Sequence, residues 1–250
     1  MSRRFQFCAA AAIVLAASCG GRKEAAPASA PAGAKHVDAA TAGVVSGRVL
    51  FKGDVPQTIP IKPGTDRVCV DENPGGIVPE ELVVDNGGLE NVFIYVRDGP
   101  NGYSFDVPTE PVKLDQHACR FVPHVLGVRT GQPLTITNSD DVAHNVHATP
   151  VSNPSFNRSQ ALKNMAETKV FDTPEVMIPF RCDIHPWMQA YVGVVDNPFF
   201  AVSHDGGRFE LKGLPPGTYI IQAVHEKFGT NSVQVTIGPK ESKDVTFTFQ

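Results

Sequence analysis

The sequence of 250 residues has few of the features that mark catalytic or nucleic-acid-binding proteins. It contains no serine or cysteine nucleophile with a plausible base and no glycine-rich phosphate loop. Charged residues make up 19% of the chain and the net charge is −4, which argues against a general affinity for nucleic acid or for anionic membrane surfaces. We therefore expect a protein that is not an enzyme and that does not bind nucleic acid.

Long apolar runs are also scarce, and the one at the N-terminus is too short to cross a bilayer. Residues 5–17 are apolar and follow the basic pair Arg3-Arg4, a pattern typical of an export signal. They end in A-A-S-C-G (16–20), which resembles the bacterial lipoprotein box, and this resemblance makes Cys19 the lipid anchor. Ordinary signal-peptidase cleavage is the alternative. Residues 1–19 are thus predicted to be a signal peptide, and the protein to be exported to the periplasm or cell envelope and anchored by lipid.

The remaining chain predicts a flexible linker followed by an all-β protein. Residues 20–43 are rich in Ala, Gly, Pro and Ser and cannot form a core. Beyond them, frequent Gly and Pro leave no room for long helices, and one helical turn is predicted at 160–167. Segments rich in Val, Ile, Phe and Thr predict short strands and hence β-sandwiches. These strands are 44–51, 82–84, 91–96, 121–128, 134–138, 145–148, 176–181, 191–195, 208–211, 218–224, 232–237 and 244–249.

The C-terminal segment carries a second recognisable pattern. D-G-G-R-F (205–209) leads into L-P-P-G-T-Y (214–219), and this resembles the carboxypeptidase regulatory-like domain, a small transthyretin-like β-sandwich. The resemblance implies a fold for residues 198–250 and little about chemistry. About fifty residues are few for an independent sandwich. The unit could take a strand from 44–51, with the intervening domain then either inserted or fused side by side.

The five cysteines divide into two outside the folded part and three within it. Cys8 lies in the signal and Cys19 is the predicted lipid site, which leaves Cys69, Cys119 and Cys182. An odd cysteine in an oxidising compartment needs an explanation. If Cys182 is a metal thiolate, the other two can pair in a disulfide, which closes a loop of about fifty residues. The alternative is a pair of buried free thiols.

The most informative segment is F-R-C-D-I-H-P-W-M (180–188), which lies between two predicted strands. Cys182, His185 and Met188 stand at three-residue steps on this loop. A thiolate and two imidazoles with a weak methionine ligand is the donor set of blue copper. Zinc would usually take more Cys, His or carboxylate ligands, and a c-type haem needs C-x-x-C-H, for which a second cysteine is missing here.

A second histidine is predicted to come from H-N-V-H (144–147), after the strand and polar turn of residues 135–141. In an extended segment, His144 and His147 point in different directions, so one of them is expected to bind. The Asn145-Val146 context favours His144. Asp140 and Asp141 are predicted to form the turn.

Together these residues give residues 121–196 a resemblance to the plastocyanin and amicyanin group of cupredoxins. The resemblance implies a Greek-key β-sandwich, with His144, Cys182, His185 and Met188 as ligands of one type 1 copper ion. It also implies that Asn145 steadies the neighbouring loops and that His185 is the ligand nearest to solvent. Pro186 has no N–H to donate toward sulfur, which favours a high potential. We assign the cupredoxin domain to 119–197 and an N-terminal β region, packing with the other units, to 44–118.

The resulting hypothesis is an exported one-electron carrier that meets a redox partner transiently through a small interface. Trp187 either belongs to that docking surface or packs over the loop. A copper-delivery protein without redox traffic is one alternative, and a glycan-binding or structural surface lipoprotein is another. A second metal site using His117, His124 or His147 is a further alternative to structural roles for those histidines.

Overall fold

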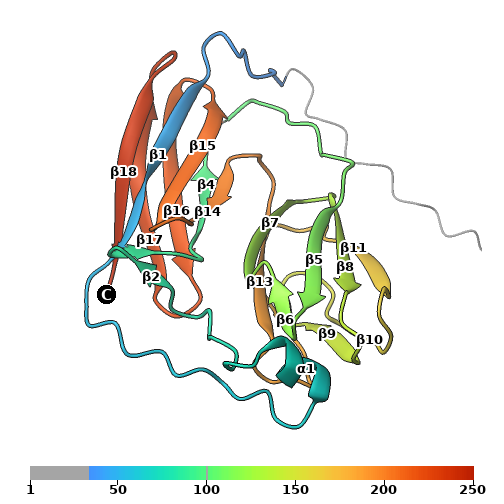
Figure 1. Ribbon diagram of the computed structural model, residues 1–250. Coiled ribbons are helices and arrows are strands. Elements are labelled where there is room, and N and C mark those ends of the chain that lie inside the picture. Colours follow the sequence, from blue (N-terminus) through green and yellow to red (C-terminus); the bar gives the residue numbers. More distant parts are fainter. Residues whose placement is uncertain (1–33, 100) are drawn as a thin grey trace, which may run out of the picture.

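The computed structural model describes residues 34–99 and 101–250. The predicted signal peptide, Cys8, Cys19 and most of the predicted linker lie outside the described residues. Within them, nearly all regular structure is β-strand, and the strands form two β-sandwiches (Figure 1). The prediction of an all-β protein built from sandwiches is confirmed.

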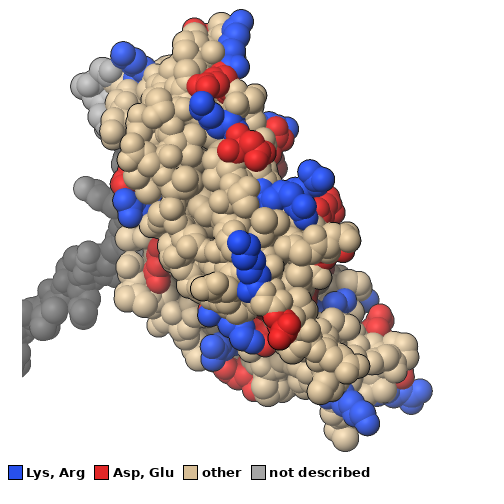
Figure 2. All heavy atoms as spheres, turned by 90° about the vertical axis from the view of Figure 1, so that its left-hand side faces the viewer, with Lys and Arg blue, Asp and Glu red and all other residues tan. Residues whose placement is uncertain are grey.

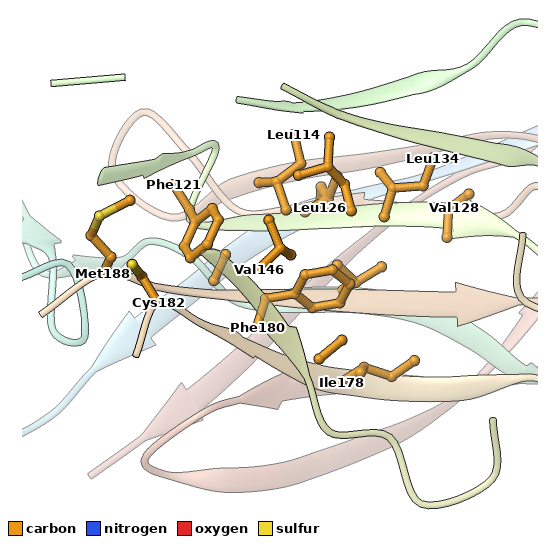
Figure 3. Close-up of a cluster of buried hydrophobic side chains, with 14 of the residues drawn as sticks. Leu114, Phe121, Leu126, Val128, Leu134, Val146, Ile178, Phe180, Cys182 and Met188 are labelled. Atoms are coloured by element: carbon orange, nitrogen blue, oxygen red, sulfur yellow. The ribbon is translucent and has the colours of Figure 1, made fainter. Parts of the chain in front are cut away.

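The middle of the chain forms one sandwich, called here the central sandwich. Its two sheets have the strand orders β10-β9-β12-β13-β7 and β11-β8-β5-β6. The strands are β5 (Val112–His117), β6 (Arg120–Val122), β7 (Val125–Arg129), β8 (Pro133–Asn138), β9 (His144–Ala148), β10 (Phe156–Gln160), β11 (Ala166–Val170), β12 (Glu175–Arg181) and β13 (Gln189–Val195). Alternation buries Leu134 and Ile136 of β8 in the same core as Ile178 and Phe180 of β12. Figure 3 shows Leu134, Ile178 and Phe180 in this core.

Both ends of the described chain meet in the other sandwich, called here the terminal sandwich. One sheet has the order β15-β1-β3-β2 with β18 also beside β1, and the other is β14-β4-β16-β17. The strands are β1 (Gly43–Phe51), β2 (Val84–Asp85), β3 (Gly88–Leu89), β4 (Phe93–Asp98), β14 (Phe200–Val202), β15 (Arg208–Leu214), β16 (Gly217–His225), β17 (Gly229–Ile237) and β18 (Ser242–Phe249). Strands β1 to β4 come before the central sandwich in the chain and β14 to β18 come after it, and β1 pairs in parallel with β18. The central sandwich is therefore an insertion within the terminal one.

This topology changes the predicted domain boundaries. Strand β5 lies upstream of the predicted start at 119, yet it pairs in parallel with β8 and belongs to the central sandwich. The region 44–118 is not one unit, because β1 to β4 belong to the terminal sandwich. Strand β5 escaped prediction because its sequence, V-K-L-D-Q-H, buries only Leu114 and Gln116 and therefore reads as polar.

The predicted helical turn at 160–167 is wrong, because Gln160 ends β10 and Ala166 begins β11. The one helix of the described residues is α1 (Arg67–Glu72), which the sequence did not predict. Asp66 caps it, with a side-chain oxygen that accepts from the Val68 N–H (3.1 Å). Helix α1 lies in the long connection from β1 to β2 and reaches the lower end of the central sandwich in Figure 1.

The two sandwiches pack closely against each other. The ring of Phe93 on β4 lies so near the backbone of Gly193 that a Cβ added there would be 2.3 Å from it. A Cβ added at Gly127 on β7 would lie 2.3 Å from the ring of Phe200. These two glycines therefore let flat strand surfaces receive aromatic rings from the other sandwich.

The face of the terminal sandwich at the left of Figure 1 carries charges of both signs, intermixed along its length (Figure 2). That mixing agrees with the small net charge of the sequence. None of the helices in the described part of the chain has the length and apolar character needed to cross a membrane.

Candidate metal centre

The loop between β12 and β13 brings two sulfur-containing side chains to one end of the central core. The Cys182 N–H donates to the Met188 carbonyl (3.2 Å), and the Met188 N–H donates to the His185 carbonyl (2.9 Å). These bonds curl the loop back on itself, so that Cys182 and Met188 lie side by side (Figure 3). Their exposed fractions are 2% and 1%.

His144, the first residue of β9, completes this group from the neighbouring strand. Its Nδ1 lies 2.9 Å from Nδ1 of His185, which in turn lies 3.8 Å from the sulfur of Cys182. The three donor atoms all lie within 4.8 Å of one another. The structure thus brings together all four predicted ligands, three with converging donor atoms and Met188 packed beside them.

Asp140 holds His144 from the side opposite Cys182. Its carboxylate lies 2.9 Å from Nε2 of His144 and also accepts from the Ala118 and Cys119 N–H groups (2.7 and 2.8 Å). Burial would raise the pKa of Asp140, but the hydrogen bonds from His144 and these amides lower it. Because a carboxylate only accepts, Nε2 of His144 carries a hydrogen, and Nδ1 is the nitrogen that faces the other donor atoms and could bind a metal once it is deprotonated.

The surroundings of Cys182 favour its thiolate. Burial would raise the pKa of the thiol, but hydrogen bonds from His144, His185 and the Asn145 N–H lower it to about 6. Burial would likewise lower the pKa of His144, yet its bonds to Asp140 and Cys182 raise it to about 9. A thiolate is the form of cysteine that binds metals, and a bound metal ion would take the place of the proton that His144 holds beside this thiolate.

Asn145 fixes the loop in the way the resemblance implies. Its Oδ1 accepts from the Asp183 N–H (2.7 Å), and its Nδ2 donates to the Asp183 carboxylate (2.9 Å). The Asp183 carboxylate also lies 3.0 Å from Nδ1 of His147. His147, the rival for the first ligand, therefore binds the outside of the loop and not the donor group.

His185 does not face solvent, contrary to the expectation from the resemblance. It is only 3% exposed, and α1 lies over it. Its Nε2 is 3.7 Å from the carboxylate of Asp66 and 3.8 Å from the sulfur of Cys69. The sequence could not show this cover, because α1 comes from a connection more than a hundred residues before the loop.

Cys69 and Cys119 form a disulfide in the structure, and Cys182 is free. The disulfide joins α1 to the turn between β5 and β6. Trp187 packs beside it, with its Nε1–H donating to the Cys119 carbonyl (3.0 Å) and its ring centroid 5.1 Å from that of His185. Trp187 is partly buried and packs over the loop, which is the second of its two predicted roles.

The described residues hold no second group of three potential ligands that includes His117, His124 or His147. The side chain of His117 is mostly exposed. His124 is buried and bonds to Gln189 and Glu226. The remaining groups of potential ligands reuse His144 or His185 with a disulfide sulfur, so they form no independent site.

Sequence reasoning missed two residues that shape the site. Asp140 was predicted only to form a turn, and Asp183 had no predicted role. A signal was present for both, since Asp140 stands four residues before His144 and Asp183 directly follows Cys182. Neither spacing is specific enough to reveal the contact without the fold.

Comparison with known proteins gives partial likenesses to copper proteins. No family model matches the chain, and no curated protein is similar to it in sequence. The Cu-containing nitrite reductase from Thermus scotoductus SA-01 matches with 21% identity and a TM-score of 0.32, over 40% of this chain and 25% of that one. The purple cupredoxin from Nitrosopumilus maritimus matches with 25% identity and a TM-score of 0.29, over 33% and 97%. A Cu(I) structure of an amicyanin mutant matches with 21% identity and a TM-score of 0.31, over 36% of this chain and 86% of that one.

This chain therefore spans only a quarter of the nitrite reductase, while it spans most of the two small cupredoxins. Because all three TM-scores are low, the case for a metal site depends on the geometry of the chain's own residues.

Proposed function

We propose that this protein binds one copper ion through His144, Cys182, His185 and Met188. The observation that supports this most is the convergence of two imidazole nitrogens and one sulfur within 4.8 Å, from the start of β9 and from the β12–β13 loop. Two imidazoles, a thiolate and a thioether form a donor set that suits both copper oxidation states. Zinc would gain little from the thioether, and its usual fourth ligand is absent from this set.

The proposed work of the site is one-electron transfer, with no catalysis. The bound copper would supply the change of one electron, and the protein would hold the ligands still in a dry setting. Asp140 fixes the His144 ring, while Asn145 and Asp183 fix the loop that carries Cys182. Ligands held by such outer contacts rearrange little when the charge of the metal changes.

The proposed setting is outside the cytoplasm, with the lipid on Cys19 as anchor and a redox protein as transient partner. The basic and apolar segment of residues 1–19 and the linker of 20–43 support this setting. A disulfide between Cys69 and Cys119 agrees with an oxidising compartment.

Titration of the purified protein with Cu(II), followed by visible spectroscopy and voltammetry, tests the proposal. We expect an intense thiolate-to-copper band and a reversible wave, both lost in Cys182→Ser. Tight Cu(I) binding without the band would support copper delivery instead. An absence of binding would contradict the copper proposal and leave the role of a structural or glycan-binding surface protein.

A further inference from the structure

A short segment that belongs to neither sheet of the central sandwich covers the candidate site. We define the cap as residues 66–73, which comprise α1 and the residues at its two ends. Asp66 and Cys69 both lie within 4 Å of Nε2 of His185, on the side of the ring away from Cys182. Cys69 is fully buried, and His185 is 3% exposed beneath it.

The cap is fastened to the central sandwich at a few defined points. The disulfide joins Cys69 to Cys119 in the β5–β6 turn. Asn73 donates from its Nδ2 to the carbonyls of both Cys69 (2.9 Å) and Ala118 (3.0 Å). The Cys119 carbonyl of the same turn accepts the hydrogen bond from the Trp187 indole N–H, so the cap, this turn and the β12–β13 loop meet at one place.

Helix α1 itself buries one side chain, that of Cys69, while Ile77 of the connection that follows packs in the core of the central sandwich. The chain leaves the terminal sandwich after β1, crosses to α1 and returns to β2, and much of this path carries no regular structure (Figure 1). One pair of backbone hydrogen bonds between Ile61 and Ile77 (both 2.8 Å) closes the base of the excursion. A segment held by few contacts is one that can open without unfolding the sandwiches.

We propose that the cap is a gate over His185 that the Cys69–Cys119 disulfide holds closed. In the closed state, metal ions, thiol reagents and a partner's redox centre cannot reach the loop from this side. The part that concerns metal and partner rests on the proposed function. The part that concerns access to the Cys182 sulfur, which lies behind His185, does not require a metal.

The chemical accessibility of Cys182 measures the opening of the gate. A buried thiol reacts through the open state, so its rate follows the open fraction when opening and closing are fast. Removing a cross-link between residues 50 positions apart gives the connection new freedom and raises that fraction. The residue is identified by mass spectrometry of its peptide, which separates it from the other cysteines of the full chain.

The experiment compares alkylation of Cys182 by iodoacetamide in metal-free full-length protein. In Cys69→Ala/Cys119→Ala we expect a rate at least about tenfold above wild type, equivalent to about 1.4 kcal/mol in the closing equilibrium. Asn73→Ala keeps the disulfide and should give a smaller increase. Arg67→Ala is the matched control, because this cap side chain is 92% exposed and its loss should leave the rate unchanged.

Circular dichroism shows whether each variant is folded, and Asn73→Ala decides the matter if the double variant does not fold. If Cys182 is alkylated at the wild-type rate in the folded Cys69→Ala/Cys119→Ala and Asn73→Ala variants, the gate proposal is wrong. It is also wrong if Cys182 of the wild type reacts as fast as a free small thiol. A chelator is expected to remove bound copper fastest from the double variant, more slowly from Asn73→Ala and slowest from the wild type. If the wild type binds no copper, the proposed function fails while alkylation still decides the gate.

Discussion

At the scale of single residues, the buried carboxylate of Asp140 connects the site to the rest of the central sandwich. It bonds at once to Nε2 of His144 and to the two amides of the β5–β6 turn. A carboxylate on the nitrogen that does not bind metal fixes the tautomer of a ligating histidine and strengthens it as a ligand. Asp140 is therefore a positioning residue for His144.

Asp140→Asn should weaken copper binding by about 10- to 100-fold, because the amide keeps the shape but loses the charge that orients His144. Competition with a chelator of known affinity measures the effect. Asp141→Asn is the matched control, since its side chain is exposed. Equal affinities of the two variants would contradict the role given to Asp140.

The choice between the two histidines of β9 is also a residue-scale prediction. His144→Ala should abolish the thiolate-to-copper band, because it removes a donor that lies 2.9 Å from the other imidazole. His147→Ala removes only a contact with Asp183 on the outside of the loop and should keep the band. The visible spectra of both variants test this choice. A band that survived in His144→Ala would show that His144 is not a copper ligand.

At the scale of elements, the end of β16 holds a histidine that is unsuited to acid. His225 is 1% exposed, packs 4.8 Å from the ring of Phe228 and accepts from the Lys227 N–H (3.1 Å). Burial lowers its pKa to about 4, so it is neutral in the folded protein. The unfolded chain binds this proton near the ordinary pKa of 6.5, so stability is lost as the pH falls from about 6.5 toward 4.

His225→Phe should reduce this sensitivity to acid. A phenyl ring fills the same aromatic pocket and cannot take up a proton. Between pH 7 and pH 5 the wild type should lose roughly 1–2 kcal/mol more free energy of unfolding than the variant. Urea unfolding at the two pH values measures the difference, and parallel losses in both proteins would show that another group causes the acid sensitivity.

The elements also show how far the sequence could predict this molecule. The metal loop and the start of β9 were predictable because their donors recur at short, specific spacings between strong strand patterns. The cap was not, because α1 is six residues long and its contact with His185 spans 116 positions of sequence. Strand β5 was missed because polar residues outnumber apolar ones in a strand that buries a glutamine.

At the scale of the whole molecule, buried contacts hold the central sandwich against the terminal sandwich in which it is inserted. Phe93 of the terminal sandwich lies on Gly193 of the central one. A second link joins His124 to Glu226, whose side chains are 2.5 Å apart and almost fully buried. His124 also bonds to the carbonyl of Gln189, the residue after Met188. The terminal sandwich thus supports, through Glu226 and His124, the side of the loop that carries Met188.

Gly193→Ala should therefore destabilise the protein, by about 1–3 kcal/mol for overpacking of a close contact. The new Cβ would lie 2.3 Å from the ring of Phe93, which is fully buried. Gly75→Ala is the matched control, because a Cβ there meets nothing within 4 Å. Chemical denaturation measures both variants, and equal stabilities would show that the packing between the sandwiches contributes little.

The central claim is that one metal ion is held by two imidazoles and a cysteine sulfur. X-ray absorption spectroscopy of the protein loaded with one equivalent of copper tests it most directly. The account predicts two nitrogen scatterers and one short sulfur scatterer around copper, with the sulfur lost in Cys182→Ser. A copper environment made only of nitrogen and oxygen in the wild type would contradict it.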